Sequence, residues 1–182
     1  NAWIAVGLFT GALTFFVGDT VIDRMGGEGR KSMVGAQAGG TALAIVLGIV
    51  LDGIPESFVA GMALLTGEGI GVAFIAAVFL SNLPESAAAS SGLKKAGWPE
   101  IRIYELWAVV TIVAGVAAAL GYKLLGDASG NTIAFVLAFG AGAILTMLAD
   151  TMMPEAFEKG GRAAGLLTTL GFGVAVLLGS ME

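Results

Sequence analysis

Two copies of a short proline–glutamate motif lie in the most apolar part of this chain. The first reads Asp52-Gly53-Ile54-Pro55-Glu56-Ser57, and the second, 29 residues further on, reads Ser81-Asn82-Leu83-Pro84-Glu85-Ser86. Each copy lies in a hydrophobic run long enough to cross a bilayer, where a carboxylate and a helix-breaking proline are both costly. Ionisable groups at that depth generally line a path for an ion or a substrate, so the repeat indicates a functional site.

The spacing of each copy puts its polar side chains on one face of a helix. Positions i and i+4 point the same way, about 6 Å apart along the axis, so Asp52 lies with Glu56 and Ser81 lies with Glu85. If the two helices pack face to face, these side chains and the Asn82 amide converge near the middle of the membrane, as ligands do at the broken helices of transporters.

The two prolines add further oxygen ligands. Pro55 and Pro84 have no N–H, so each releases the carbonyl four residues before it and is expected to bend its helix. Small residues beside the motifs are expected to let the two helices approach closely: Gly53, Ser57, Ser86, Ala87, Ala88 and Ala89.

No Lys, Arg or His lies between Thr41 and Gly92 to neutralise the three acids. One ionised carboxylate costs at least about 2.5–3.5 kcal/mol at a helix centre, so three together are expected to be protonated or bound to a cation. The simpler interpretation is that these residues only bend two buried helices and hydrogen-bond within them. Two matched copies with an additional Asp favour a cation site instead.

The composition is that of an integral membrane protein. Of 182 residues, 57% are hydrophobic and 13% are charged, against about 25% charged in soluble domains, and the mean hydropathy is +0.90. The 29 glycines suit close helix packing in lipid. Because the chain has no Cys and no His, a metal site must use oxygen ligands, with Met sulfur as a weak addition.

Six segments have about the 20 residues that a membrane span needs. They are approximately 2–18, 34–65, 69–93, 103–125, 131–153 and 162–180. We expect an all-α, polytopic transmembrane bundle in which residues 1–182 form a single domain. Eight of the nine basic residues follow the first, third and fifth spans, so the positive-inside rule places that side in the cytoplasm and the C-terminus outside. The expected location is the plasma (inner) membrane.

A third motif, Asp150-Thr151-Met152-Met153-Pro154-Glu155, ends the fifth span. Asp150 and Glu155 are candidates for a cytoplasmic exit for a cation. The alternative, which the sequence leaves open, is a helix end whose acids meet water and Lys159.

Three other polar regions are expected to be structural. Pro99-Glu100 is expected to begin a helix, and Asp19 and Asp23 to lie at a solvated helix end beside Arg24. The group of Tyr104, Glu105 and Trp107 is typical of the belt that lies at the membrane surface.

The order of these motifs resembles the ZIP (Zrt/Irt-like) family of divalent metal transporters over the whole chain. In that family the fourth helix typically carries His-Asn-x-Pro-Glu-Gly, and the fifth carries a Pro-Glu-Gly motif led by His or Gln. By this resemblance the six spans are helices three to eight of an eight-helix fold, so two helices would precede Asn1. The resemblance also implies a metal transporter rather than an enzyme.

The resemblance places the first metal on Asp52, Glu56, Ser81 and Glu85. Asp52 stands where His is usual and Ser81 where His or Gln is usual, so the nitrogen ligands are replaced by oxygen. The family's second metal would fall on Gly53, Asn82 and Thr111, of which only Asn82 is a good ligand. One main site is therefore expected, built from Asp52, Glu56, Ser81, Asn82 and Glu85. The transported ion is expected to be zinc, or manganese or iron.

Two alternatives stay open: a proton- or sodium-coupled carrier of another substrate, and a membrane metal sensor that does not transport. An intramembrane protease is disfavoured because there is no His base and no membrane-embedded Gly-x-Gly-Asp motif. No P-loop for nucleotide occurs. The expected partners are metal ions and membrane lipid, with no nucleic acid, and a homodimer is left open.

Overall fold

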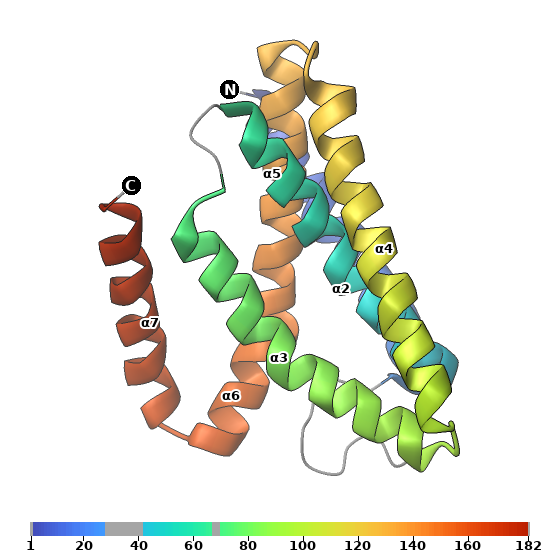
Figure 1. Cartoon of the computed structure of the whole chain (residues 1–182). Helices are drawn as coiled ribbons and strands as arrows, with labels where there is room; N and C mark the ends of the chain where they lie inside the picture. The colour runs from blue at the N-terminus through green and yellow to red at the C-terminus, as the bar shows by residue number, and fades with distance from the viewer. Residues whose placement is uncertain (1, 28–41, 67–69, 182) are drawn as a thin grey trace.

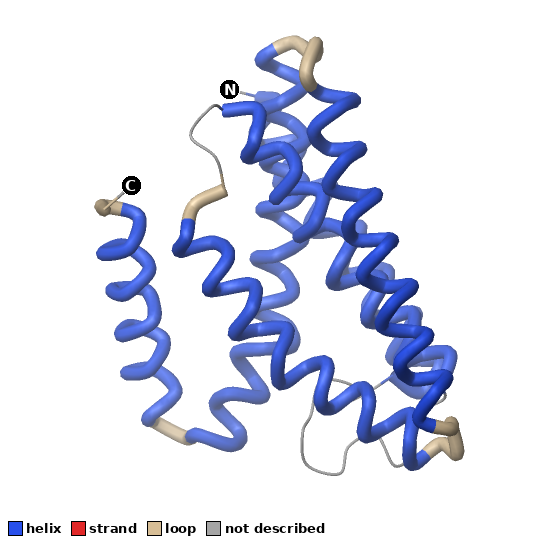
Figure 2. The backbone as a smooth tube through the Cα atoms, in the orientation of Figure 1, coloured by secondary structure: helices blue, strands red, loops and turns tan. Residues whose placement is uncertain are grey.

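The chain forms a bundle of long helices (Figures 1 and 2). The computed structural model describes residues 2–27, 42–66 and 70–181, and within these ranges it contains helices and turns but no strand. The elements follow in the order α1 (Ala2–Ile22), η1 (Asp23–Gly27), α2 (Ala42–Ala63), η3 (Leu64–Thr66), α3 (Val72–Lys95), α4 (Glu100–Leu125), α5 (Gly130–Met147), η4 (Leu148–Met152), α6 (Met153–Gly160) and α7 (Ala163–Gly179). The predicted all-α membrane bundle is confirmed.

Five of the six expected spans are long and apolar enough to cross a membrane: Ala2–Gly26, Ala42–Ala63, Val72–Lys95, Glu100–Leu125 and Gly130–Gly160. The sixth, α7, is apolar but has only 17 residues. The fifth was expected to end at 153, but η4 and α6 extend it to Gly160. Residues 34–41 of the second expected span lie outside the described residues.

Glycines bring the central helices into backbone contact. A Cβ atom on Gly11 of α1 would overlap the Phe139 carbonyl of α5, and one on Gly142 would overlap the Leu8 carbonyl. In the same way Gly61 of α2 lies against the carbonyl oxygen of Ala118 in α4. This packing of α1 on α5 and of α2 on α4 confirms the expected role of small residues.

The turn from α3 into α4 is a Schellman motif. Gly97 has φ +86°, the Trp98 N–H donates to the Leu93 carbonyl at 3.0 Å, and the Gly97 N–H donates to the Lys94 carbonyl at 3.1 Å. Pro99 then caps α4, which starts at Glu100. The helix start predicted there is confirmed.

α3 and α7 lie outside the central helices. α3 crosses the bundle obliquely and α7 stands beside its first half (Figure 1). In the most apolar 18-residue stretch of α3 only 11% of the residues are buried, against 33% in the corresponding stretch of α2. α3 therefore has fewer packing contacts to hold it than α2.

Candidate metal site

A cavity of about 430 Å³ lies between α2, α3 and α4, near the middle of these three helices. We call it the central cavity. Its polar lining comes from both proline–glutamate motifs and from α4, and consists of Glu56, Ser57, Asn82, Glu85, Ser86, Trp107 and Thr111. None of its lining residues is basic. The structure thus brings the two motif glutamates, 29 residues apart, to the wall of one cavity.

Glu56 lies on the buried side of α2. The buried residues of this helix recur every three or four positions and include Ile45, Ile49, Asp52 and Glu56, which is the period of one helix face. Asp52 is 4% exposed and Glu56 is 8% exposed. The shared face that the i, i+4 spacing predicted for these two acids is therefore present.

Asn82 links α3 to α2 at the cavity wall. Its Nδ2 donates to Glu56 Oε2 at 3.1 Å and to the Val78 carbonyl at 2.9 Å. Both partners are acceptors, which assigns the amide orientation: the two N–H groups are used here and Oδ1 remains as the acceptor. Asn82 therefore orients the Glu56 carboxylate and still offers an oxygen ligand.

Ser81 and Glu85 meet at a second cavity, of about 230 Å³, which we call the side cavity. It lies between α3 and the η4–α6 segment and is lined by Ser81, Pro84, Glu85, Met152, Glu155, Ala156 and Lys159. Glu85 lines both cavities. Ser81 shares a cavity with Glu85, but its hydroxyl donates to the Val78 carbonyl at 3.1 Å.

Asp52 is buried, but it lines neither the central cavity nor the side cavity. Across residues 2–27, 42–66 and 70–181, no three acidic side chains lie close enough together to hold one ion. The three carboxylates therefore do not form a single cluster in this conformation, although two of them share the central cavity.

The two acids of the third motif are in different places. Asp150 is exposed in η4, whereas Glu155 lines the side cavity and pairs with Lys159, Oε1 to Nζ, at 2.6 Å. The pairing with Lys159 agrees with the alternative of a helix end, and the place of Glu155 in the cavity wall leaves the exit path as a prediction. No basic residue lies between Thr41 and Gly92 in the sequence, but α6 brings Lys159, from further along the chain, to the side cavity that Glu85 also lines.

Trp107 lines the candidate site, although the sequence assigned it to the membrane surface. Its side chain is half-buried, lines the central cavity, and donates from Nε1 to Ser90 Oγ of α3 at 2.9 Å. Its neighbour Tyr104 is 70% exposed, as expected of a belt residue. The spacing of Trp107, Thr111 and Ala114 places them on one face of α4, and all three line the cavity. This spacing could have identified Trp107 from the sequence.

Two further expectations are corrected. A Cβ on Gly53 would meet nothing within 4 Å, so this glycine widens the cavity wall instead of bringing α2 close to α3. Asp19 is only 8% exposed, because α1 packs close to α2 there: a Cβ on Gly18 would meet the Leu51 side chain at 3.0 Å. It is not at a solvated helix end.

These features define a helical membrane protein with an acidic cavity between its helices. A protein of Arabidopsis thaliana named "Putative zinc transporter" is 26% identical to this chain over 160 residues, which are 86% of this chain and 25% of that protein. The chain thus spans about a quarter of the relative's length. This similarity supports the resemblance to the ZIP family.

No family model matches the chain. No solved structure matches it either.

Proposed function

We propose that this protein moves a divalent transition metal across the membrane through the central cavity. The observation that carries the proposal is that Glu56 and Glu85 line one cavity, near the middle of three apolar helices, with no basic residue in its wall. Two carboxylates in such surroundings favour a doubly charged guest over water alone.

Glu56, Asn82 and Glu85 supply the oxygen ligands of the proposed site. Asp52 and Ser81 join it when α2 and α3 shift relative to one another. The sparse packing of α3 supports such a shift, since loosely packed elements move at low cost. In this mechanism the ion enters from outside, binds, and leaves past Glu85 into the side cavity beside Glu155.

Zinc is the first candidate ion because the similar Arabidopsis protein is named as a zinc transporter. Manganese and iron remain candidates since all the proposed ligands are oxygen atoms.

The test is uptake of radioactive zinc or manganese by proteoliposomes. Glu56→Gln and Glu85→Gln keep the side-chain size and remove the charge, so each should reduce uptake by at least about tenfold. Glu105→Gln is the matched control because Glu105 is exposed on α4 and lines neither cavity. Uptake by the two cavity variants at the wild-type rate would refute the site.

The same vesicles separate the alternatives. Proton or sodium flux without metal uptake would identify a carrier of another substrate. Metal bound at equilibrium without uptake would identify a sensor.

A further inference from the structure

The side cavity contains one basic group among its lining residues. Lys159 Nζ lies 2.6 Å from Glu155 Oε1, and their side chains are 38% and 25% exposed. Glu85 lines the same cavity. An ion that passes Glu85 from the central cavity therefore meets an ammonium group already paired with the next carboxylate.

The local sequence accounts for this position. Glu155 and Lys159 are four residues apart on α6 with the acid nearer the N-terminus, which is the favourable order for a helical ion pair. η4 is a π-helical turn directly before α6, and Pro154 is placed at the start of α6. α6 ends at Gly160, and Gly161 has φ +54°. Lys159 thus lies at the last turn, where a long side chain can move between the cavity and water.

Resting on the function proposed above, we propose that Lys159 is a tethered cation that competes with the transported metal for the carboxylates of the side cavity. Its pairing with Glu155 neutralises one of the two acids there, and its ammonium repels an incoming divalent ion. The metal enters the side cavity when Lys159 leaves Glu155 for water. Lys159 thereby sets the apparent affinity for metal on this part of the path.

The charge of the side cavity makes the proposal quantitative. With Glu85, Glu155 and Lys159 all in their charged forms, the side cavity has a net charge of −1 in the wild type. Lys159→Met gives −2, Glu155→Gln gives 0, and the double variant returns to −1. If Lys159 competes with metal, the metal concentration for half-maximal uptake falls in Lys159→Met, rises in Glu155→Gln, and returns towards the wild-type value in the double variant. Each single change should be about three- to tenfold.

A purely structural ion pair predicts a different pattern. Removing either partner of a helix-stabilising pair weakens α6 in the same direction, so both single variants would change uptake with the same sign. Opposite signs therefore distinguish competition from stabilisation. Lys159→Arg, which keeps the charge, should retain the wild-type half-maximal concentration.

The matched control is the pair of Lys94 and Glu100, which has the same 2.6 Å distance and lines neither cavity. Lys94→Met and Glu100→Gln should leave the half-maximal concentration unchanged. A change equal to that of the side-cavity variants would overturn the proposal, since the effect would then belong to surface charge in general.

A chemical version of the experiment avoids variants that fold poorly. The chain has no cysteine, so Lys159→Cys can be modified after folding with a methanethiosulfonate that adds either an aminoethyl cation or a neutral methyl group. The cationic adduct should raise the half-maximal concentration relative to the neutral adduct. Equal values for the two adducts would overturn the role of Lys159. Absence of any metal uptake by the wild type would instead overturn the proposed function.

Discussion

At the scale of a single residue, Asn82 is the side chain that connects the two motif helices in the proposed site. A carboxylate that must bind a metal needs its orientation fixed in advance, and a hydrogen bond from a neighbouring group does this. The Asn82 amide donates to Glu56 across the α2–α3 contact and to its own helix at Val78. Ser57 and Ser86, in contrast, donate to the carbonyls of Gly53 and Leu83 on their own helices, so these hydroxyls are not used to hold a carboxylate.

Asn82→Ala should therefore weaken metal binding without preventing insertion of the bundle. A hydrogen bond to a charged group contributes about 1.5–3 kcal/mol, and about 1.4 kcal/mol is a factor of ten, so the dissociation constant for zinc or manganese should rise about tenfold or more in equilibrium dialysis. Ser86→Ala is the control because Ser86 lines the same cavity but donates to its own helix. Asn82→Ala removes both the hydrogen bond to Glu56 and the proposed Oδ1 ligand, so an unchanged dissociation constant would show that this amide neither orients Glu56 for binding nor binds the metal.

At the scale of elements, the bundle divides into tightly and loosely packed helices. α1 with α5, and α2 with α4, pack through glycines that admit no side chain. α3 carries one Pro-Glu motif and has little buried surface. It is held to its neighbours in part by the Asn82–Glu56 and Trp107–Ser90 hydrogen bonds. The spanning part of α4 is as little buried as that of α3, at 11% each, but α4 packs on α2 through glycines. Of these two helices, α3 is therefore better suited to motion around the cavity.

Gly11→Ala tests whether α1 and α5 are tightly packed. The added methyl group would overlap the Phe139 carbonyl, so α1 must move away from α5 at a cost of about 1–3 kcal/mol. The thermal midpoint in detergent should fall by about 3–10 °C. Gly115→Ala is the control because a Cβ there meets nothing within 4 Å, and alanine favours the helix over glycine. Equal midpoints for the two variants would show that the α1–α5 contact is not tight.

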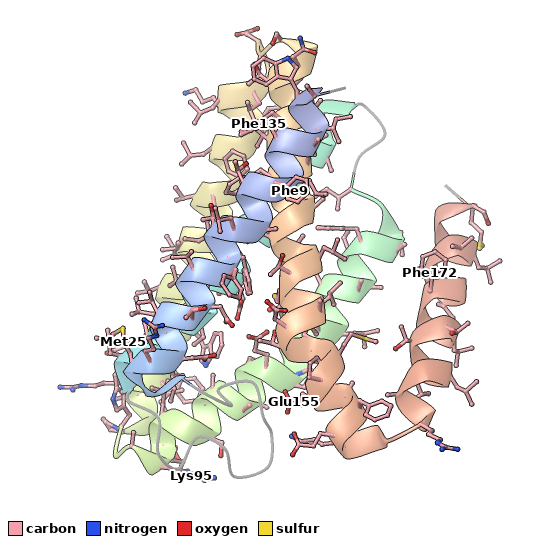
Figure 3. All side chains as sticks on the ribbon, turned by 180° about the vertical axis from the view of Figure 1, so that it is seen from behind. Phe9, Met25, Lys95, Phe135, Glu155 and Phe172 are labelled. Atoms are coloured by element: carbon pink, nitrogen blue, oxygen red, sulfur yellow. The ribbon has the colours of Figure 1, made fainter. Side chains whose placement is uncertain are left out.

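At the scale of the whole molecule, the basic residues expected at each end of the bundle predict how the protein is oriented in the membrane. Met25, Lys95 and Glu155 lie toward one end of the bundle, and Phe9 and Phe135 toward the other (Figure 3). The start of α1 and the end of α7 both lie toward this other end (Figure 1). Lys123, in the last turn of α4, is the basic residue expected on that side. Arg30 and Lys31, which the sequence assigned to the basic side, lie outside the described residues.

The positive-inside rule therefore predicts the sides from which single cysteines can be labelled. In intact cells, Lys123→Cys should react with a membrane-impermeant maleimide added outside, and Lys95→Cys should react only after the membrane is opened. Both side chains are exposed, so accessibility within the protein does not limit either reaction. The reverse pattern would place the C-terminus in the cytoplasm.

The sequence by itself determined the class of this protein and the face on which its acids lie. Long apolar segments must form helices in lipid because no water is present there to bond to the backbone. The i, i+4 spacing then requires Asp52 and Glu56 to share a side of α2, and both are buried. These properties are local, so they can be predicted without knowledge of the packing.

Only the tertiary structure decided which side chains from different helices meet. It placed Glu56 with Glu85 in one cavity, left Asp52 and Asp150 out of both cavities, and added Trp107 from α4. It also brought Lys159 from more than 70 residues further along the chain to the side cavity of Glu85. Such meetings depend on how closely helices approach and how they are rotated about their axes. The distance between helices and their rotation are set by the glycine contacts and by the η4 turn. The spacing of residues within each motif contains no information about either.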